Sequence, residues 1–218
     1  TIKLLGYFFD PIKDEFFVEF RINLFSRRRG KPTGPDLQLG EDPLLYIQRC
    51  GKFTRRLALR ISNSVFCYSG QLQSLQIQCR LCFRQALLLN PDAGWDTQLC
   101  TKTMELYAKL FKNITQCNGY RWARSILPKE GHIETDSYPM LLAIADASLE
   151  AAAARVYLVT QSSNKTEKHA ALIFGKAQVA RLKQIGADAL SVPKMECQGA
   201  WLAAMAVLAL LQNLEIRI

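Results

Sequence analysis

The 218-residue chain is about half apolar, so it can bury one sizeable core or two small ones. Its 28 Lys and Arg against 19 Asp and Glu leave a net charge of +9, which favours a polyanionic partner, most simply nucleic acid. The seven cysteines, an odd number at irregular spacing, exclude a disulfide-scaffold protein and indicate reduced thiols in an intracellular protein.

The first two apolar runs predict a β-hairpin. Lys3–Phe9 and Glu15–Asn23 are rich in strand-forming residues, and the turn-forming stretch DPIKD separates them. Residues 26–43 carry Gly, Pro and charge without periodicity, which predicts an exposed loop.

The middle of the chain, from Leu44 to about Cys117, has the apolar periodicity of helices. Thr54 is the expected N-cap of one helix that ends near Gly70. Two more helices are expected over Ser74–Leu89, which stops at Asn90-Pro91, and from about Thr97 to Thr115. Residues 118–138 hold Gly, Pro and polar residues and mark a domain boundary, in which 120–127 is either a short strand or a linker.

The last part of the chain predicts three strands and a helix. The run MLLAIADAS (Met140–Ser148) has strand length and ends in a single aspartate, Asp146. Two further strands are expected over Ala152–Thr160 and His169–Phe174. A long helix then begins near Pro193, with Glu196 in its first turn. A strand that ends in a lone Asp, followed by a helix that begins with Glu, indicates a nuclease-type site with metal between carboxylates.

Two alternatives stay open for the apolar run Gly199–Leu211. It is short for a bilayer-spanning segment, so a buried helix is the main interpretation and a membrane-embedded helix is the alternative. A start at Thr1 rather than Met is typical of a processed product, a polyprotein piece or an incompletely known sequence.

Zinc is not expected at the C-x-x-C pair Cys79 and Cys82, because no second pair exists and the chain holds two histidines. The basic residues, by contrast, are clustered and are the expected nucleic-acid contacts. They are Arg27, Arg28, Arg29, Lys31, Arg49, Lys52, Arg55, Arg56, Arg60, Lys176, Arg181 and Lys183.

Three C-terminal runs carry a family resemblance: DASLEAAAARVYLV, LIFGKAQVARLK and SVPKMECQGAWLAAMAVL. They resemble the RNase H-like segment of BEL/Pao-type retrotransposon polyproteins, where an Asp-Ala-Ser strand end precedes a Tyr-containing strand, an "aKsrVAplK" stretch and an "iPRlEL" helix start. The matching positions are Asp146-Ala147-Ser148, Val156-Tyr157-Leu158, Gly175-Lys176, Val179-Ala180, Leu182-Lys183 and Val192-Pro193-Lys194-Met195-Glu196.

The N-terminal part resembles the same family in the same order. LLGYFFDPIKDEFFVEF is similar to the hairpin after the polymerase palm, TRRLALRISNSVFCYSGQL to the helix "TKReiLs..s..fDplGll", and GWDTQL to the "WDe.l" connection. The chain departs from the family at Cys67-Tyr68-Ser69, where the family has Asp-Pro, and at Lys194, where it has arginine.

The resemblance implies an α+β fold in two modules. Residues 1–117 would be a β-hairpin plus a helical module like a reverse transcriptase thumb or connection. Residues 118–218 would be a partial RNase H-like unit, a three-stranded antiparallel meander plus a helix. The open edge of that sheet is expected to be covered by other protein chains. The polymerase aspartates would precede Thr1, and a third RNase H carboxylate would follow Ile218.

Hydrolysis of the RNase H type needs about three or four carboxylates around two Mg²⁺ ions. The chain offers Asp146 and Glu196 at matching positions, while Glu150 and Asp188 lack a spacing that places them together. Asp146 and Glu196 are therefore interpreted as ancestral catalytic and metal-binding positions without present activity. No cofactor is expected, apart from weakly bound Mg²⁺ if any RNase H activity persists.

The function predicted from the sequence is that of a retroelement-derived, non-catalytic RNA-binding or scaffolding subunit of a ribonucleoprotein such as an organellar ribosome. This hypothesis names mitochondria as a candidate compartment. One alternative is a fragment of an active reverse transcriptase and RNase H polyprotein that hydrolyses RNA in RNA–DNA hybrids. A second alternative is a membrane-complex subunit.

Overall fold

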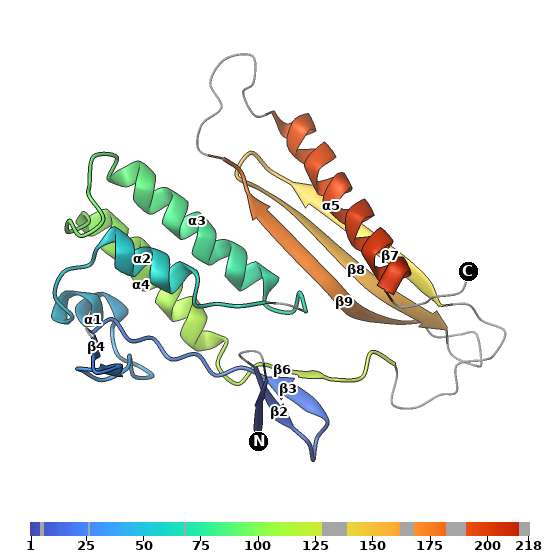
Figure 1. The fold of residues 1–218 in the computed structure, drawn as a ribbon, viewed down its shortest axis with the longest axis horizontal. Coiled ribbons are helices and arrows are strands. Elements are labelled where there is room, and N and C mark those ends of the chain that lie inside the picture. Colours follow the sequence, from blue (N-terminus) through green and yellow to red (C-terminus); the bar gives the residue numbers. More distant parts are fainter. Residues whose placement is uncertain are drawn as a thin grey trace. The chain divides into compact units, whose positions relative to one another are not determined.

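The computed structural model of the chain describes residues 1–4, 7–25, 27–67, 69–127, 139–161, 168–181 and 191–213. The fold is α+β, as predicted, and combines helices with antiparallel sheets (Figure 1). Its contacts form two compact units: an N-terminal unit of Thr1–Phe66 with Gln78–Ala123, and a C-terminal unit of Cys67–Ile77 with Arg124–Ile218. Compactness does not test independent folding, so the domain boundary at residue 118 stays a prediction.

The sheet of the N-terminal unit has four strands in the order β1-β2-β3-β6. The run expected as one strand over residues 3–9 contributes to two strands, which pair antiparallel with Leu4 opposite Tyr7. The segment after the helices, expected as a strand or a linker, supplies the last strand, which pairs with β3. The strands are β1 Ile2–Leu4, β2 Tyr7–Asp10, β3 Glu15–Phe17 and β6 Arg121–Ala123.

Four helices follow: α1 Pro43–Arg49, α2 Arg55–Ser62, α3 Gln73–Leu89 and α4 Thr101–Gln116. Thr54 caps α2 as predicted, since its hydroxyl accepts a hydrogen bond from the Leu57 N–H at 3.3 Å. This helix ends well before the predicted Gly70. Asn63 takes the C-cap position, and the Ser64 hydroxyl donates to the Ile61 carbonyl at 2.7 Å.

Helix α4 is held against α2 by Tyr107, whose side chain is fully buried. The Tyr107 hydroxyl donates to the Ala58 carbonyl at 3.2 Å and shares a hydrogen bond with the Ser62 hydroxyl at 2.9 Å. The ring of Phe53 lies edge-on to that of Tyr107, with 5.0 Å between centroids. The buried hydroxyl therefore has partners, which avoids the cost of an unpaired polar group.

The cysteines of the two helices differ in environment. Burial raises the pKa of Cys79 to about 12 and that of Cys82 to about 11, and both thiols lie in α3. Cys100 is exposed at the N-cap of α4, where a hydrogen bond with Thr103 lowers the pKa of its thiol. Only the thiolate reacts with alkylating agents, so Cys100 should react faster than Cys79 and Cys82.

We expect iodoacetamide at about pH 8 to modify Cys100 in the native protein and to spare Cys79. As pH rises, the rate at Cys100 should increase earlier than the rate of an ordinary thiol, because its lowered pKa yields thiolate at lower pH. Peptide mass spectrometry measures both positions, with urea-unfolded protein as the control in which both react. Equal labelling of Cys79 and Cys100 in the native protein would contradict the assignment.

The C-terminal unit is an antiparallel meander with one helix on it, as predicted (Figure 1). Its elements are β7 Met140–Ala147, β8 Ala151–Gln161, β9 Lys168–Val179 and α5 Val192–Asn213. Strand β8 lies in the centre and alternates between more and less buried positions, with Ala152, Ala154 and Val156 buried. This period-two pattern is that of a strand with one face more buried than the other.

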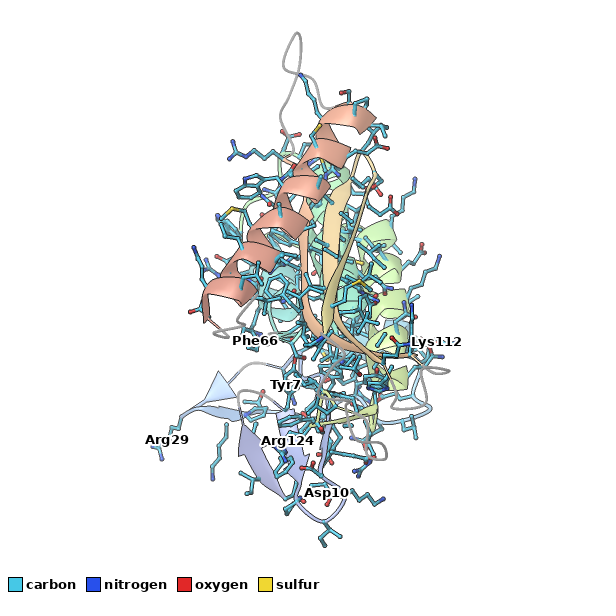
Figure 2. The ribbon with its side chains drawn as sticks, turned by 90° about the vertical axis from the view of Figure 1, so that its right-hand side faces the viewer. Tyr7, Asp10, Arg29, Phe66, Lys112 and Arg124 are labelled. Atoms are coloured by element: carbon cyan, nitrogen blue, oxygen red, sulfur yellow. The ribbon has the colours of Figure 1, made fainter. Side chains whose placement is uncertain are left out.

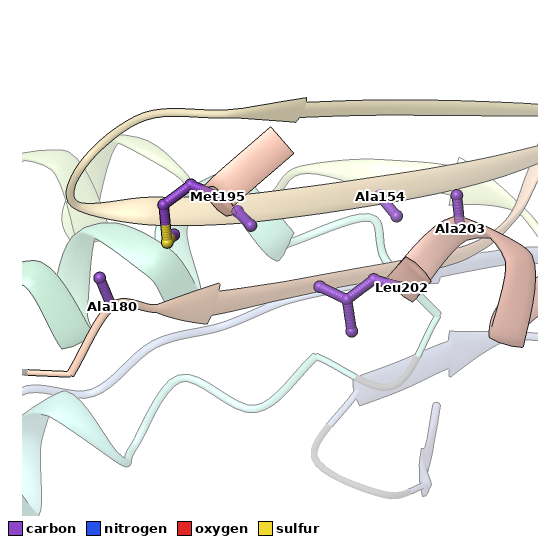
Figure 3. Close-up of a cluster of buried hydrophobic side chains, with 6 residues drawn as sticks. Ala154, Ala180, Met195, Leu202 and Ala203 are labelled. Carbon is purple, nitrogen blue, oxygen red and sulfur yellow. The ribbon is translucent and has the colours of Figure 1, made fainter. Parts of the chain in front are cut away.

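Helix α5 packs on β7 and β8 through the buried Met195, Leu202 and Ala203 (Figure 3). Ala206 is buried on the same helix. Gly199 is buried against the sheet, where a Cβ would be in ordinary contact with the Asp146 carbonyl oxygen at 3.4 Å. The helix is long and apolar enough to cross a membrane by length and composition alone. The sequence predicted a buried helix here; in the structure α5 is buried along the side that faces the sheet, while Trp201, Met205 and Leu208 are exposed.

Candidate functional site

Asp146 lies on the face of the C-terminal sheet that α5 does not cover. The Cβ of Ala145 is 3.6 Å from where a Cβ of Gly199 would be, so Ala145 faces the helix. Since successive side chains of a strand point to opposite faces, Asp146 points the other way. It is exposed and pairs in register with Ala153.

A hollow of about 350 Å³ opens on this face, with Asp146 in its lining. Its other lining residues are Gln73, Ser74, Ile77, Ile144, Ala153, Ala154, Arg155, Tyr157 and Ala177. Most of these are apolar, and the charged groups among them are one carboxylate and one guanidinium. The hollow can therefore hold a ligand that combines an apolar part with a polar group.

Gln73, Ser74 and Ile77 form one wall of the hollow. They belong to residues 69–77, here called the strap, which includes the start of α3. The strap meets the sheet at Gly70, where a Cβ would lie 2.7 Å from the Cα of Gly175 in β9. Gln73 is 3% exposed, and its amide donates to the Ala154 carbonyl at 3.3 Å. The strap is thus bonded to the backbone of the central strand.

The strap also fixes Arg155. The Arg155 Nε donates to Gln73 Oε1 at 3.0 Å, and its Nη2 donates to Ser74 Oγ at 3.1 Å. Arg155 is two positions along β8 from Ala153, the partner of Asp146, so the two charged residues occupy diagonal positions across two strands. The guanidinium is consequently held in one place before any ligand arrives.

These donors do not fit a two-metal centre. Among the described residues, no group of three His, Cys, Asp or Glu could hold a metal ion. Asp146 supplies the one carboxylate of the hollow, and Arg155 supplies a positive charge that disfavours dications nearby. Mg²⁺ requires several hard oxygen ligands, so this set fits a single weakly held ion.

The structure does not bring the two predicted carboxylates into one hollow. Glu196 is exposed in the first turns of α5, which packs on the opposite face of the sheet from Asp146. Glu150 is exposed in the turn between β7 and β8, and Asp188 lies outside the described residues. The metal-binding roles of Asp146 and Glu196 stay predictions.

Most of the predicted basic block between residues 49 and 60 has protein partners. Arg49 pairs with Glu41 at 2.7 Å, and Arg56 pairs with Asp96 at 2.9 Å. The hydrogen bond from Arg56 also holds the pKa of the exposed Asp96 below its usual value. Two further arginines donate to backbone carbonyls, Arg60 to Asn23 and Arg55 to Asn90 and Pro91. These four arginines fasten loops, and a phosphate would compete with those bonds.

The other predicted cations are placed differently. Arg27–Arg28 (β4) and Lys31–Pro32 (β5) form a two-stranded sheet with Arg29 in its turn, where a featureless loop was expected. Lys52, Lys176 and Arg181 are exposed, and Lys183 lies outside the described residues.

Sequence reasoning missed three lysines and the residues of the strap. Lys102, Lys109 and Lys112 are exposed along one side of α4, and their helical spacing was an available signal. A charged residue inside the run AAAARVYLVT was a signal for Arg155, but nothing in the sequence pointed to Gln73 or Ser74 as its partners.

The positive charge belongs to the N-terminal unit. That unit contains 18 Lys and Arg against 10 Asp and Glu, a difference of +8, whereas the C-terminal unit contains 10 against 9, a difference of +1. Together they account for the net charge of +9. The unit that carries Asp146 is nearly neutral.

Comparison with known families gives one match, to the model of the Pao retrotransposon-like RNaseH-like domain, over residues 54–218. The matched region includes α2, the strap and the whole meander with α5. No curated protein matches the chain.

Proposed function

Because the chain belongs to the family of Pao retrotransposon-like RNase H-like domains, we propose that it binds nucleic acid as a non-hydrolysing component of a ribonucleoprotein. RNase H-like domains generally bind nucleic acid, which makes RNA or an RNA–DNA hybrid the natural partner. An organellar ribosome is one assembly of this kind, and a mitochondrial location is part of the same proposal.

The observation that carries the proposal is the separation of charge between the units. An excess of +8 in the N-terminal unit gives a polyanion a place to bind without base-specific contacts. The exposed lysines of α4 add to this field, and Figure 2 labels one of them, Lys112. Binding through phosphates is salt-dependent, because each contact releases a counterion.

Support for binding without hydrolysis comes from the hollow. Among the described residues, the hollow has one carboxylate beside a fixed guanidinium, a set that does not by itself place two dications on either side of a scissile phosphate. The charge that develops on the leaving oxygen would then lack most of its stabilisation.

Protein partners belong to the same proposal. Among the described residues, β7 is an edge strand of the meander. Its side chains Met140, Leu142 and Ile144 are 42–53% exposed. A long apolar edge is a template for pairing with another chain unless it is covered. We therefore propose that another protein covers this edge in the assembly.

Fluorescence anisotropy with a labelled RNA–DNA hybrid tests the proposal. We expect the logarithm of the binding constant to fall linearly with the logarithm of salt concentration, with a slope of several units between about 50 and 200 mM. Incubation with Mg²⁺ should leave the RNA strand intact. Affinity that does not change with salt would contradict the proposed function.

A second candidate is hydrolysis of RNA in hybrids, which the position of Asp146 in the hollow favours. Gel analysis of the RNA strand with Mg²⁺ decides, with Asp146→Asn compared against Glu150→Gln, a control at an exposed acid in the neighbouring turn. Cleavage that disappears in Asp146→Asn but persists in Glu150→Gln would establish hydrolysis in place of simple binding.

A further inference from the structure

The most unusual backbone of the N-terminal unit lies in residues 27–32, here called the basic hairpin. Arg28 is registered opposite Lys31, and the two residues between them, Arg29 and Gly30, have φ angles of 51° and 80°. Positive φ at both central residues of a two-residue loop is the signature of a type I′ turn. Glycine adopts this conformation freely, but arginine does so rarely.

Gly30 suits the turn, but two other features of the basic hairpin oppose its formation in the free protein: the residue at the first turn position and the concentration of positive charge. Type I′ turns favour Asn, Asp or Gly at the position that Arg29 occupies. The register pairs Arg28 with Lys31 across the two strands. Residues 27–32 hold four cations and no acid.

The base of the hairpin is nevertheless firmly built. The Asn23 side-chain amide donates to the Gly34 carbonyl at 3.0 Å and to Asp36 Oδ1 at 2.7 Å. The buried Tyr46 hydroxyl lies 3.1 and 3.0 Å from the carbonyl oxygens of Ile22 and Pro35, to which its single proton can be donated in turn. The chain on both sides of the hairpin is thus fixed to the same residues.

Packing closes the base further. The Phe25 ring lies directly on Gly34, where a Cβ would be 2.6 Å from the ring Cδ1. The same ring is edge-on to Tyr46, with 6.0 Å between centroids. The strained turn therefore projects from a rigid support, and Arg29 extends away from the ribbon (Figure 2).

We propose that the basic hairpin is a finger that binds the phosphodiester backbone of nucleic acid, with Arg29 at its tip. This inference rests on the proposed function and assigns the contact to one element. A phosphate beside the tip offsets the charge repulsion expected of four cations within residues 27–32. Arginine suits the tip because its guanidinium binds phosphate oxygens in a two-pronged geometry. An unfavourable backbone conformation that is held by well-packed neighbouring residues is typical of a functional element rather than of a solvated loop.

The test uses Arg29→Asn, which improves the turn and removes the charge. The variant should unfold at the same or a higher temperature than the wild type, because asparagine suits type I′ turns. Its binding to a labelled RNA–DNA hybrid should weaken several-fold at about 50 mM salt, and the salt slope should fall by about one unit. The full chain is used, with circular dichroism to verify folding.

Lys13→Asn is the matched control, since Lys13 is an exposed cation in the β2–β3 turn of the same unit. It should leave the salt slope within error of the wild type. Equal losses of hybrid affinity in Arg29→Asn and Lys13→Asn would show that only the net charge matters, and would contradict a specific role of the basic hairpin. Wild-type binding by Arg29→Asn would overturn it too, while the proposed function would hold as long as the salt dependence persists. A wild-type protein without salt-dependent binding would remove the proposed function itself.

Discussion

Replacement of Gly70 by alanine is expected to destabilise the C-terminal unit by about 3 kcal/mol. Gly70 has a φ of +87°, a conformation that costs a residue with a Cβ about 1 to 2 kcal/mol. The new Cβ would also lie 2.7 Å from the Cα of Gly175, a backbone atom that cannot rotate away, and such overpacking adds about 1 to 3 kcal/mol. Urea unfolding followed by circular dichroism measures the sum.

Gly40→Ala separates the two causes. Gly40 has nearly the same φ, +84°, but no atom lies within 4 Å of its Cβ position. It should lose the conformational part alone, about 1 kcal/mol. Equal losses at Gly40 and Gly70 would show that the strap does not approach β9 closely, and the wall of the hollow would then need another explanation.

The elements that the sequence predicted correctly are those whose signals are local. Thr54 caps α2 because a hydroxyl before a helix needs only the next turn to bond to. The helix that stops at Asn90 is similar, since the Asn90 amide donates to the Ala86 carbonyl one turn back. The run over 140–148 has strand length and strand composition, which was enough to place β7.

The face of β7 that carries Asp146 was not predictable in the same way. Residues of this strand are apolar on both faces, so alternation does not tell which side meets α5. The answer comes from the contact between Ala145 and Gly199, a residue of a helix far along the chain. Asp146 and Glu196 match neighbouring motifs, yet the Asp146 side chain and helix α5, which carries Glu196, lie on opposite faces of the sheet.

The remaining side chains of the site are positioned by partners that are distant in the sequence. Arg155 is fixed by Gln73 and Ser74, about 80 residues earlier, and no local rule links these positions. The arginines at 55, 56 and 60 looked like phosphate contacts because no acid stands among them. Their partners are carbonyls and a carboxylate supplied by other loops, which a reading of local charge cannot detect.

Replacement of Leu202 by alanine should cost the C-terminal unit about 3 kcal/mol, within the range of about 2 to 5 for buried leucines. The buried cluster under α5 consists mainly of alanines, so Met195 and Leu202 are its large side chains (Figure 3). A cavity at Leu202 cannot be filled by short neighbours, and the helix loses the contact that fixes its centre to the sheet. Urea unfolding again provides the measurement.

Leu208→Ala on the same helix is the control, because Leu208 is 47% exposed whereas Leu202 is 3% exposed. Both changes remove the same atoms and alter helix propensity equally, so their difference reports burial alone. A helix that buries one side on a sheet predicts a loss of less than about 1 kcal/mol at Leu208. If Leu208→Ala costs as much as Leu202→Ala, the outer side of α5 is covered as well, either by a partner chain or by lipid. Repeating the pair with detergent micelles then separates these covers, because insertion of Leu208 into the micelle would increase the cost of Leu208→Ala only if that side of α5 enters lipid.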